Sequence, residues 1–413
     1  MARYLIVILL GCIAIGLLSC GEECVSTRDD PRPLTATETR LVQSYNAFGF
    51  KLLSEIASNQ TNENIILSPV SVSMALGMTM NGSAGSTEEA MKSTLEFSGL
   101  TMEEIDQCYC SLIALLRGLD QEVRFDIANS IWYRLGLPFE SDFLNTCEHY
   151  FDAEVRGLDF GMPDAASIIN HWVSDQTNGK IKKIVDDPIN PLIVIFLINA
   201  IYFKADWTNQ FDPDFTRDDT FTLPDGSQTP CRMMQQPETG KQGKFTYFGN
   251  EELQLIDLPY GNKLFSMTIL LPGEGRDINS VIAGLDSDTW NQLMDSLGTC
   301  MGHLSMPKFE LTYESELSKI LASLGMGIAF SEVADFSRMC DGCGIFISQV
   351  RHKTYIKVDE VGTEAAAVTS VSGATSVGDS FVMRVDRPFL FAIRENHSGT
   401  VLFVGKIIDP GYE

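Results

Sequence analysis

The sequence lacks the short motifs that mark common catalytic sites. Its 413 residues contain no G-x-S-x-G turn, H-E-x-x-H helix, P-loop or G-x-G-x-x-G dinucleotide fingerprint. Only five histidines are present, and His171 stands beside Trp172 in an apolar helical pattern that is typical of a packed or surface histidine. We therefore expect no hydrolase activity, no cofactor and no metal.

Basic side chains are scarce, with 30 Lys and Arg against 55 Asp and Glu, which gives a net charge of −25. Such a surface repels nucleic acid and anionic lipid, so neither is an expected partner. No Pro/Gly/Ser linker and no repeat divides the chain. Helical spacing over 44–57 and 315–326, and buried strand-like runs over 191–203 and 264–272, predict one α+β domain.

Long apolar runs are also absent, except at the amino terminus. Arg3 precedes an apolar run from Leu5 to Leu18, which is the pattern of a secretory signal and too short for a stable membrane span. We assign residues 1–19 to this signal and expect a secreted, extracellular protein.

The signal ends in Leu-Leu-Ser followed by Cys20, which resembles a bacterial lipoprotein signal, although Leu18 stands where a smaller residue is preferred. We expect lipidation of Cys20, a membrane contact only through that anchor, and a polar tether over 20–36 in the cell envelope. Ordinary cleavage near Ser19 or Gly21, which would release the protein, is the alternative.

Ten cysteines are present, and eight remain once the leader and a lipidated Cys20 are set aside. This even number permits disulfides in an oxidising compartment. Cys340 and Cys343 have C-x-x-C spacing, but no second ligand pair lies nearby. A local disulfide and free thiols in a reducing habitat both remain open.

The segment from Glu360 to Gly378 has no charge after Glu364, no proline and almost no large side chain. Its alternate residues form one small uncharged face, namely Thr363, Ala365, Ala367, Thr369, Val371 and Gly373. This alternation is typical of a strand with one packed face, so the loop is suited to becoming a strand. The alternative is a surface loop that is merely rich in Ala, Ser and Thr.

These residues resemble the hinge of the reactive-centre loop of serpins, the serine protease inhibitors. Serpin-like segments follow in the family's order at 64–76, 169–181, 198–207, 258–272, 306–311 and 386–410. The resemblance implies an α+β serpin fold, with helices around a large mixed central sheet, two smaller sheets and an exposed loop over 360–386. We assign residues 37–413 to this domain.

The resemblance also implies a mechanism. A protease cleaves the loop, and the freed amino-side segment enters a vacant strand position of the sheet before the acyl-enzyme is hydrolysed. The hinge would comprise Glu360, Gly362, Thr363, Glu364, Ala365, Ala366 and Ala367, with Gly362 supplying unusual backbone dihedrals. The residues that would support sheet opening are Ser68, Ser71, Asn199, Trp207, Lys308 and His352. Lys308 would form a salt bridge with Glu360, and Trp207 would lie beneath that pair.

The usual family offset from Glu360 places the reactive bond between Ser376 and Val377, with Thr375 as a neighbouring alternative; counting back from Arg387 gives Val377 on the amino side. Small residues here favour an elastase-like serine protease, with cysteine proteases as a second class. No sulfated polysaccharide is expected, because residues 101–112 carry three acids and no base. We expect a monomer. A non-inhibitory binding or chaperone-like surface protein and a structural lipoprotein are the alternatives.

Overall fold

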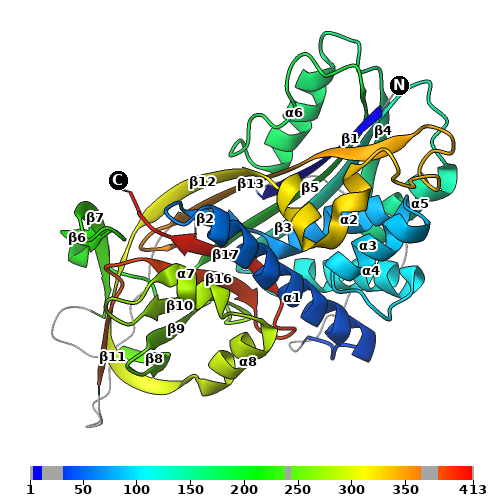
Figure 1. Cartoon of the computed structure of the whole chain (residues 1–413). Coiled ribbons are helices and arrows are strands. Elements are labelled where there is room, and N and C mark those ends of the chain that lie inside the picture. Colours follow the sequence, from blue (N-terminus) through cyan, green and yellow to red (C-terminus); the bar gives the residue numbers. More distant parts are fainter. Residues whose placement is uncertain (1–2, 12–30, 238–242, 364–379, 412–413) are drawn as a thin grey trace.

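The computed structural model describes residues 3–11, 31–237, 243–363 and 380–411. Helices are interspersed with strands along the chain, and the strands form two sheets (Figure 1). The helices are α1 (Ala36–Asn59), α2 (Pro69–Asn81), α3 (Gly85–Thr94), α4 (Met102–Gly118), α5 (Ser141–Phe151), α6 (Ala165–Gln176), α7 (Ile278–Ala283), α8 (Ser287–Ser296) and α9 (Ser318–Leu321). This mixture agrees with the predicted α+β class.

The central sheet, called sheet A here, has seven described strands. Its order is β12 (Phe309–Glu316), β13 (Ile345–Val358), β1 (Arg3–Gly11), β5 (Ile193–Asp206), β3 (Val123–Arg134) and β4 (Ala153–Leu158), and β14 (Gly362–Thr363) pairs with β5. Parallel and antiparallel pairs both occur, so the predicted mixed sheet is confirmed. The apolar run in β5 is buried over its first eleven residues, as expected for a strand covered on both faces.

The two faces of sheet A are covered by different parts of the chain. Ile195, Leu197 and Ile201 of β5 belong to the main core, which also contains the wholly buried residues of α2. Ile198 and Ala200 belong to a second cluster with residues of α6, the helix that stands apart from the others in Figure 1. Alternate side chains of one strand therefore enter separate cores.

A second sheet holds the remaining ten described strands. They are β2 (Ile65–Leu67), β17 (Val401–Ile407), β16 (Phe389–Glu395), β10 (Phe265–Pro272), β9 (Leu253–Tyr260), β8 (Gly243–Gly249), β11 (Gly298–Pro307), β7 (Gln228–Gln236), β6 (Arg217–Thr222) and β15 (Phe381–Arg384). The two smaller sheets that were expected are continuous here, because β11 pairs with β8 through Gly298–Gly302 and with β7 through Leu304–Pro307.

The amino terminus differs from the expectation of a vacant strand position. β1 lies in the middle of sheet A, between β13 and β5 and parallel to both. In the full chain, β1 therefore fills most of the strand position between β5 and β13 that was expected to be vacant. The assignment of residues 1–19 to a signal stays a prediction.

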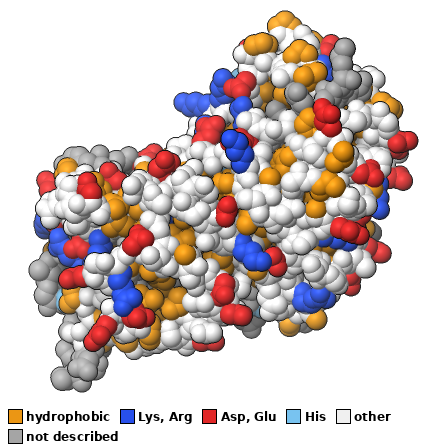
Figure 2. All heavy atoms as spheres, in the orientation of Figure 1, with side chains coloured by type: hydrophobic (Ala, Val, Ile, Leu, Met, Phe, Trp, Pro, Cys, Tyr) orange, Lys and Arg blue, Asp and Glu red, His pale blue; other side chains and the backbone are white. Residues whose placement is uncertain are grey.

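Charged side chains of both signs are scattered over the face shown in Figure 2, without one large basic patch. No helix within the described ranges is long and apolar enough to cross a membrane.

Candidate functional site: the hinge and the centre of sheet A

The segment from Asp359 to Thr363 leaves β13 and is held by a set of residues that we call the hinge clamp: Trp207, Thr216, Tyr260 and Lys308. The indole Nε1 of Trp207 donates to the Asp359 carbonyl at 3.0 Å, and its backbone N–H donates to the Val361 carbonyl at 2.8 Å. The Trp207 ring is buried and stacks on Tyr260 at a centroid distance of 4.3 Å. Trp207 is therefore a buried base for the hinge.

Glu360 is fixed by two donors. Lys308 Nζ lies 2.9 Å from its Oε2, and the Thr216 hydroxyl donates to its Oε1 at 2.7 Å. Burial pushes the pKa of Glu360 upward, but the bonds from Lys308 and Thr216 outweigh burial, so the pKa lies below its usual value. The structure thus contains the ion pair that the resemblance implies, between a buried Glu360 and a partly exposed Lys308, where removing the lysine leaves a desolvated charge.

Gly362 has a different role from the one expected. Its backbone does not adopt a positive φ, so the prediction of unusual dihedrals was wrong. A Cβ at this position would lie 2.2 Å from the Ala205 carbonyl oxygen, closer than any side chain tolerates. Glycine is needed because the hinge backbone lies directly against β5.

Thr363 is the last described residue before the loop, and it already forms part of sheet A. Gly362 pairs with Asp206 and Thr363 with Ala205, in antiparallel orientation. The Thr363 side chain is buried, and its hydroxyl lies 2.8 Å from the Tyr260 hydroxyl. A strand that continued from Thr363 would run down β5 from this end.

The centre of sheet A contains the other predicted support residues. Ser68 caps α2: its hydroxyl accepts from the Ser71 backbone N–H at 3.3 Å and donates to the Leu402 carbonyl at 2.7 Å. Its backbone N–H donates to His352 Nε2 at 3.3 Å. The start of α2 is therefore bound to β13 and β17 behind the sheet.

Asn199 on β5 and His352 on β13 are fully buried on either side of β1. Asn199 donates to Asn129 Oδ1 at 2.7 Å. Three polar atoms here, Asn199 Oδ1, His352 Nδ1 and Ser71 Oγ, have no hydrogen-bond partner among the described residues. Burial lowers the pKa of His352 to about 3, so the ring is neutral at ordinary pH. These orphan atoms mark a polar spot within an apolar sheet.

The remaining predicted residues lie outside the described ranges. They are Glu364, Ala365, Ala366 and Ala367 of the hinge, Thr375, Ser376 and Val377 at the predicted reactive bond, and Cys20. Their assigned roles stay predictions.

Sequence reasoning missed Thr216, Tyr260 and Asn129, which contact the hinge or Asn199. Thr216 and Tyr260 come from segments far from the hinge in sequence, and neither carries a local motif. Only the tertiary fold brings them to the site.

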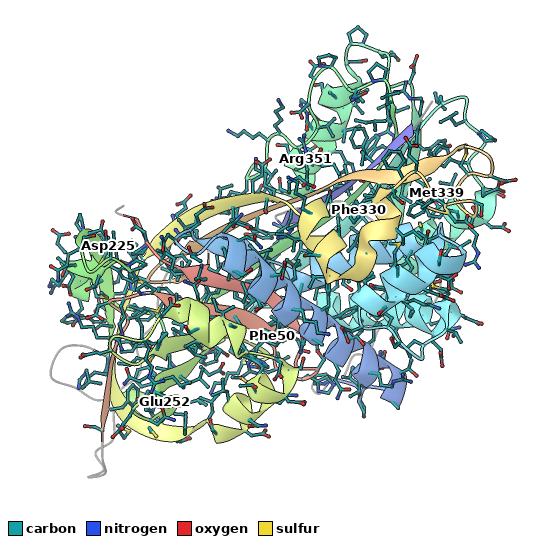
Figure 3. All side chains as sticks on the ribbon, viewed as in Figure 1. Phe50, Asp225, Glu252, Phe330, Met339 and Arg351 are labelled. Carbon is teal, nitrogen blue, oxygen red and sulfur yellow. A yellow bond between two sulfur atoms is a disulfide. The ribbon has the colours of Figure 1, made fainter. Side chains whose placement is uncertain are left out.

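β13 is also attached to the segment that follows α6. Arg351, labelled in Figure 3, donates to the Ile184 carbonyl at 3.1 Å and lies 2.6 Å from Asp186 Oδ2. That segment therefore crosses sheet A and is anchored to the strand on the far side of β1 from β5.

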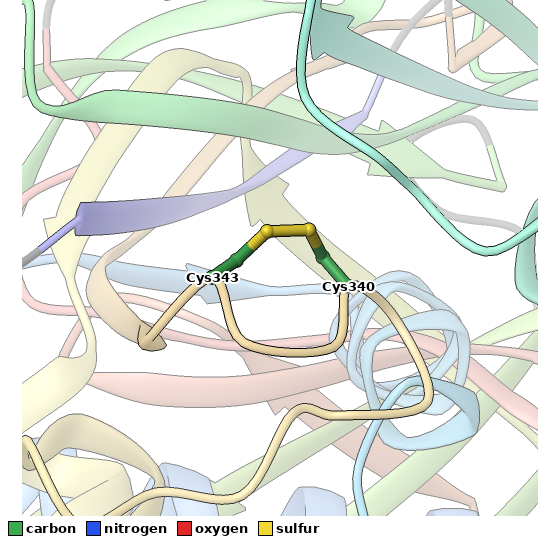
Figure 4. The surroundings of a disulfide bond; sticks show 2 residues. All are labelled: Cys340 and Cys343. Carbon is green, nitrogen blue, oxygen red and sulfur yellow. A yellow bond between two sulfur atoms is a disulfide. The ribbon is translucent and has the colours of Figure 1, made fainter.

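Cys340 and Cys343 form a disulfide in the turn before β13 (Figure 4). The open question about this pair is thus resolved in favour of a local disulfide. Of the residues in the described ranges, no group of three or more His, Cys, Asp or Glu is placed to hold a metal ion.

The comparisons with known proteins agree with this architecture. The family model described as "Serpin (serine protease inhibitor)" matches residues 43–410. An uncharacterized serpin-like protein of Thermococcus kodakarensis is 33% identical over 90% of this chain and 86% of its own length. Serine protease inhibitor 42Dd of Drosophila melanogaster is 32% identical over 87% of this chain and 94% of its own. The chain belongs to the serpin family.

Solved structures support the same fold. The native state of the thermophilic serpin tengpin has a TM-score of 0.81 and 30% identity, covering 92% of this chain and 96% of its own. Human thyroxine-binding globulin also gives 0.81 and 30%, covering 91% of this chain and 100% of its own. The predicted serpin fold is confirmed.

Proposed function

We propose that this serpin inhibits serine proteases by acting as a suicide substrate. A protease cleaves the loop between Ser376 and Val377, and the segment that begins at Thr363 enters sheet A before water hydrolyses the acyl-enzyme. Relatives named as serine protease inhibitors support this class of activity.

The observation that carries the proposal is the antiparallel pairing of Gly362 with Asp206 and of Thr363 with Ala205. Strand formation at the hinge has begun beside β5. Extending the one-to-one register places Ala365 opposite Phe203, Ala367 opposite Ile201 and Thr369 opposite Asn199.

The same register accounts for the alternation in the loop. Residues paired across a sheet point to one face, and Ala205, Phe203 and Ile201 all enter the main core. The small residues at 363, 365 and 367 would therefore face that core, where a charge is expensive to bury. Glu364 would point to the other face, opposite Lys204.

Thr369 would arrive at the orphan atoms. A hydroxyl opposite Asn199, on the core-facing side of the new strand, could donate to Asn199 Oδ1 or accept from His352 Nδ1, which carries the ring proton because Nε2 accepts from the Ser68 backbone N–H. Satisfying such a buried polar group is worth about 1–3 kcal/mol, and it would favour complete insertion.

Specificity follows from the small side chains near the proposed reactive bond. A pocket that requires a basic residue would form no ion pair with Ser376, and a deep aromatic pocket would remain unfilled. An elastase-like serine protease is the proposed target, and a cysteine protease with a small pocket is the second choice.

Incubation of the chain that begins at Gly21, which lacks the leader residues of β1, with an elastase tests the proposal. We expect a complex that survives SDS electrophoresis and a released carboxyl-terminal fragment that begins at Val377 in mass spectrometry. Clean cleavage without a complex would contradict inhibition. It would favour a non-inhibitory binding protein, the alternative for which the similarity to thyroxine-binding globulin provides a precedent in this fold.

We also propose that the protein acts outside the cytoplasm as a monomer, anchored through diacylated Cys20. The support is the apolar run that ends at Ser19-Cys20. A change of Cys20 to Ser should release the protein from membranes into the medium. Equal membrane retention of both forms would contradict the anchor.

A further inference from the structure

The leader residues occupy the strand position that the loop would need. Arg3 to Gly11 pair with Ile345 to Thr354 of β13, and Tyr4 to Leu10 pair with Ile193 to Ala200 of β5. In the described part of the chain, β5 and β13 do not pair with each other, so β1 joins the two halves of sheet A along their length, and β14 joins them at the hinge end by pairing with β5.

The two strands would compete for the same places on β5. Leu5 to Leu10 pair with Ile195 to Ala200. The register of β14, extended from Thr363 and Ala205, assigns those same positions to residues 373 to 368. Only Ile201 to Lys204 of β5 lie between the partners of β1 and those of β14. Insertion beside an intact β1 would stop after Ala367.

β1 fits the position by backbone bonding and burial. It meets both neighbours over most of its length, Leu5 is fully buried, and the Ser348 hydroxyl donates to the Leu5 carbonyl at 2.8 Å. The segment from Tyr4 to Leu10 carries no charge and no proline. Parallel pairing of a β-branched, apolar run on both sides is typical of a central buried strand.

The fit is incomplete at one point. Leu9 pairs with both Asn199 and His352, the residues whose Oδ1 and Nδ1 lack partners. A leucine cannot hydrogen-bond to either atom. The position is thus polar at its centre, and β1 leaves this polarity unsatisfied.

We propose that residues 3–11 plug sheet A in the chain that retains its leader, so that removal of the leader opens the sheet and makes loop insertion possible. The effect on inhibition rests on the proposed function, whereas the presence of the plug is tested without a protease. Leader removal would then be an activating step as well as a targeting step.

Hydrogen–deuterium exchange of the full chain tests the plug directly. We expect amides of residues 4–10 to exchange at least about 100-fold more slowly than in an unfolded peptide, since a central strand opens rarely. Val7→Pro removes one N–H from the middle of β1 and should abolish this protection. Ala14→Pro lies beyond β1 and serves as the matched control, with protection retained. Unprotected amides over 4–10 in the unmodified chain would overturn the proposal.

The consequence is tested with a chain that begins at Gly21, which retains the whole segment matched to the family. We expect this chain and full-length Val7→Pro to form the SDS-resistant complex with elastase at least about tenfold faster than the full chain or its Ala14→Pro variant. Equal rates in all four proteins would contradict the plug while leaving inhibition intact. Failure of the Gly21 chain to form any complex would contradict the proposed function, and hydrogen exchange would still decide whether β1 is formed.

Discussion

At the scale of single residues, the hinge is selected for smallness and for the absence of charge. Gly362 leaves no room for a Cβ against Ala205, and Thr363 is buried with its hydroxyl on Tyr260. The small face was readable from the sequence because strand alternation is a local pattern. The reason for Gly362 was not, since it depends on Ala205, which lies in a strand far earlier in the chain.

Thr363→Arg is expected to convert the inhibitor into a substrate. Arginine at this buried position must either stay out of the sheet or bring an unpaired charge into the core, at a cost of several kcal/mol. The measurement, in the chain that begins at Gly21, compares the fraction of elastase trapped as complex with the fraction of loop that is cleaved without trapping. Ser380→Arg, at an exposed site after the loop, adds the same charge and should leave trapping unchanged. Undiminished trapping by Thr363→Arg would rule out insertion from this hinge.

Ser376→Arg is expected to redirect inhibition toward proteases of trypsin-like specificity. An arginine on the amino side of the reactive bond supplies the ion pair that such a pocket requires. Complex formation with trypsin should rise by at least about tenfold and with elastase should fall, because one such contact is worth 1.4 kcal/mol or more. If trypsin gains nothing, or cleaves elsewhere by mass spectrometry, the assigned bond is wrong.

His352 makes stability depend on pH. Its pKa is about 3 when folded, whereas an exposed histidine titrates near 6.5. Below pH 6.5 the unfolded chain therefore binds the extra proton, and stability falls as the pH falls. Between pH 7.5 and 5.0 the loss from this group is about 2 kcal/mol.

His352→Asn should remove this part of the pH dependence, whatever it does to stability at neutral pH. The measurement is the guanidinium unfolding midpoint at pH 7.5 and 5.0 for wild type, His352→Asn and the exposed control His171→Asn. A decline in His352→Asn as steep as in the wild type would show that another group is responsible.

At the scale of elements, the decisive feature is which strand lies beside β5. The buried runs that form β5 and β10 were predictable from their predominantly apolar sequence. The helix expected over 315–326 is confirmed in part. Ser318–Leu321 form α9 and Ala322–Met326 continue it as a π-helix in which Gly325 has a φ of 119°, whereas Ser315 and Glu316 extend β12 against His352 and Arg351. Pairing with β13 prevails over local helical spacing there.

The ion pair between Lys308 and Glu360 holds the start of β14 in place, so it should contribute more than a surface pair. Lys308→Met leaves the buried Glu360 carboxylate with Thr216 as its remaining side-chain donor, and should lower the free energy of unfolding by about 1–3 kcal/mol. It should also increase the susceptibility of the hinge to proteolysis.

Arg276→Met, which breaks the exposed pair with Glu252, is the control and should change stability by no more than about 0.5 kcal/mol. Thermal and guanidinium unfolding of the two variants provide the comparison. If the two substitutions lowered the free energy of unfolding equally, the Lys308–Glu360 pair would contribute no more than an ordinary surface ion pair.

At the scale of the whole molecule, sheet A is divided into two halves that are joined through a replaceable strand. The family order of motifs predicted the fold, but the occupation of the central position by the leader was not predicted. A leader sequence reads as a targeting signal because its composition is apolar, and composition does not reveal which partner strands are available. The pairing partners exist only once β5 and β13 have been brought together by the fold.

The central claim is that the molecule gains stability when its loop enters sheet A. The most direct test compares the melting temperatures of intact and loop-nicked protein in the chain that begins at Gly21, where β1 is absent. Roughly ten new ladder hydrogen bonds, each worth about 0.5–1.5 kcal/mol, should add on the order of 10 kcal/mol, so the nicked form should melt at a much higher temperature. An unchanged or lower melting temperature after nicking would contradict the account.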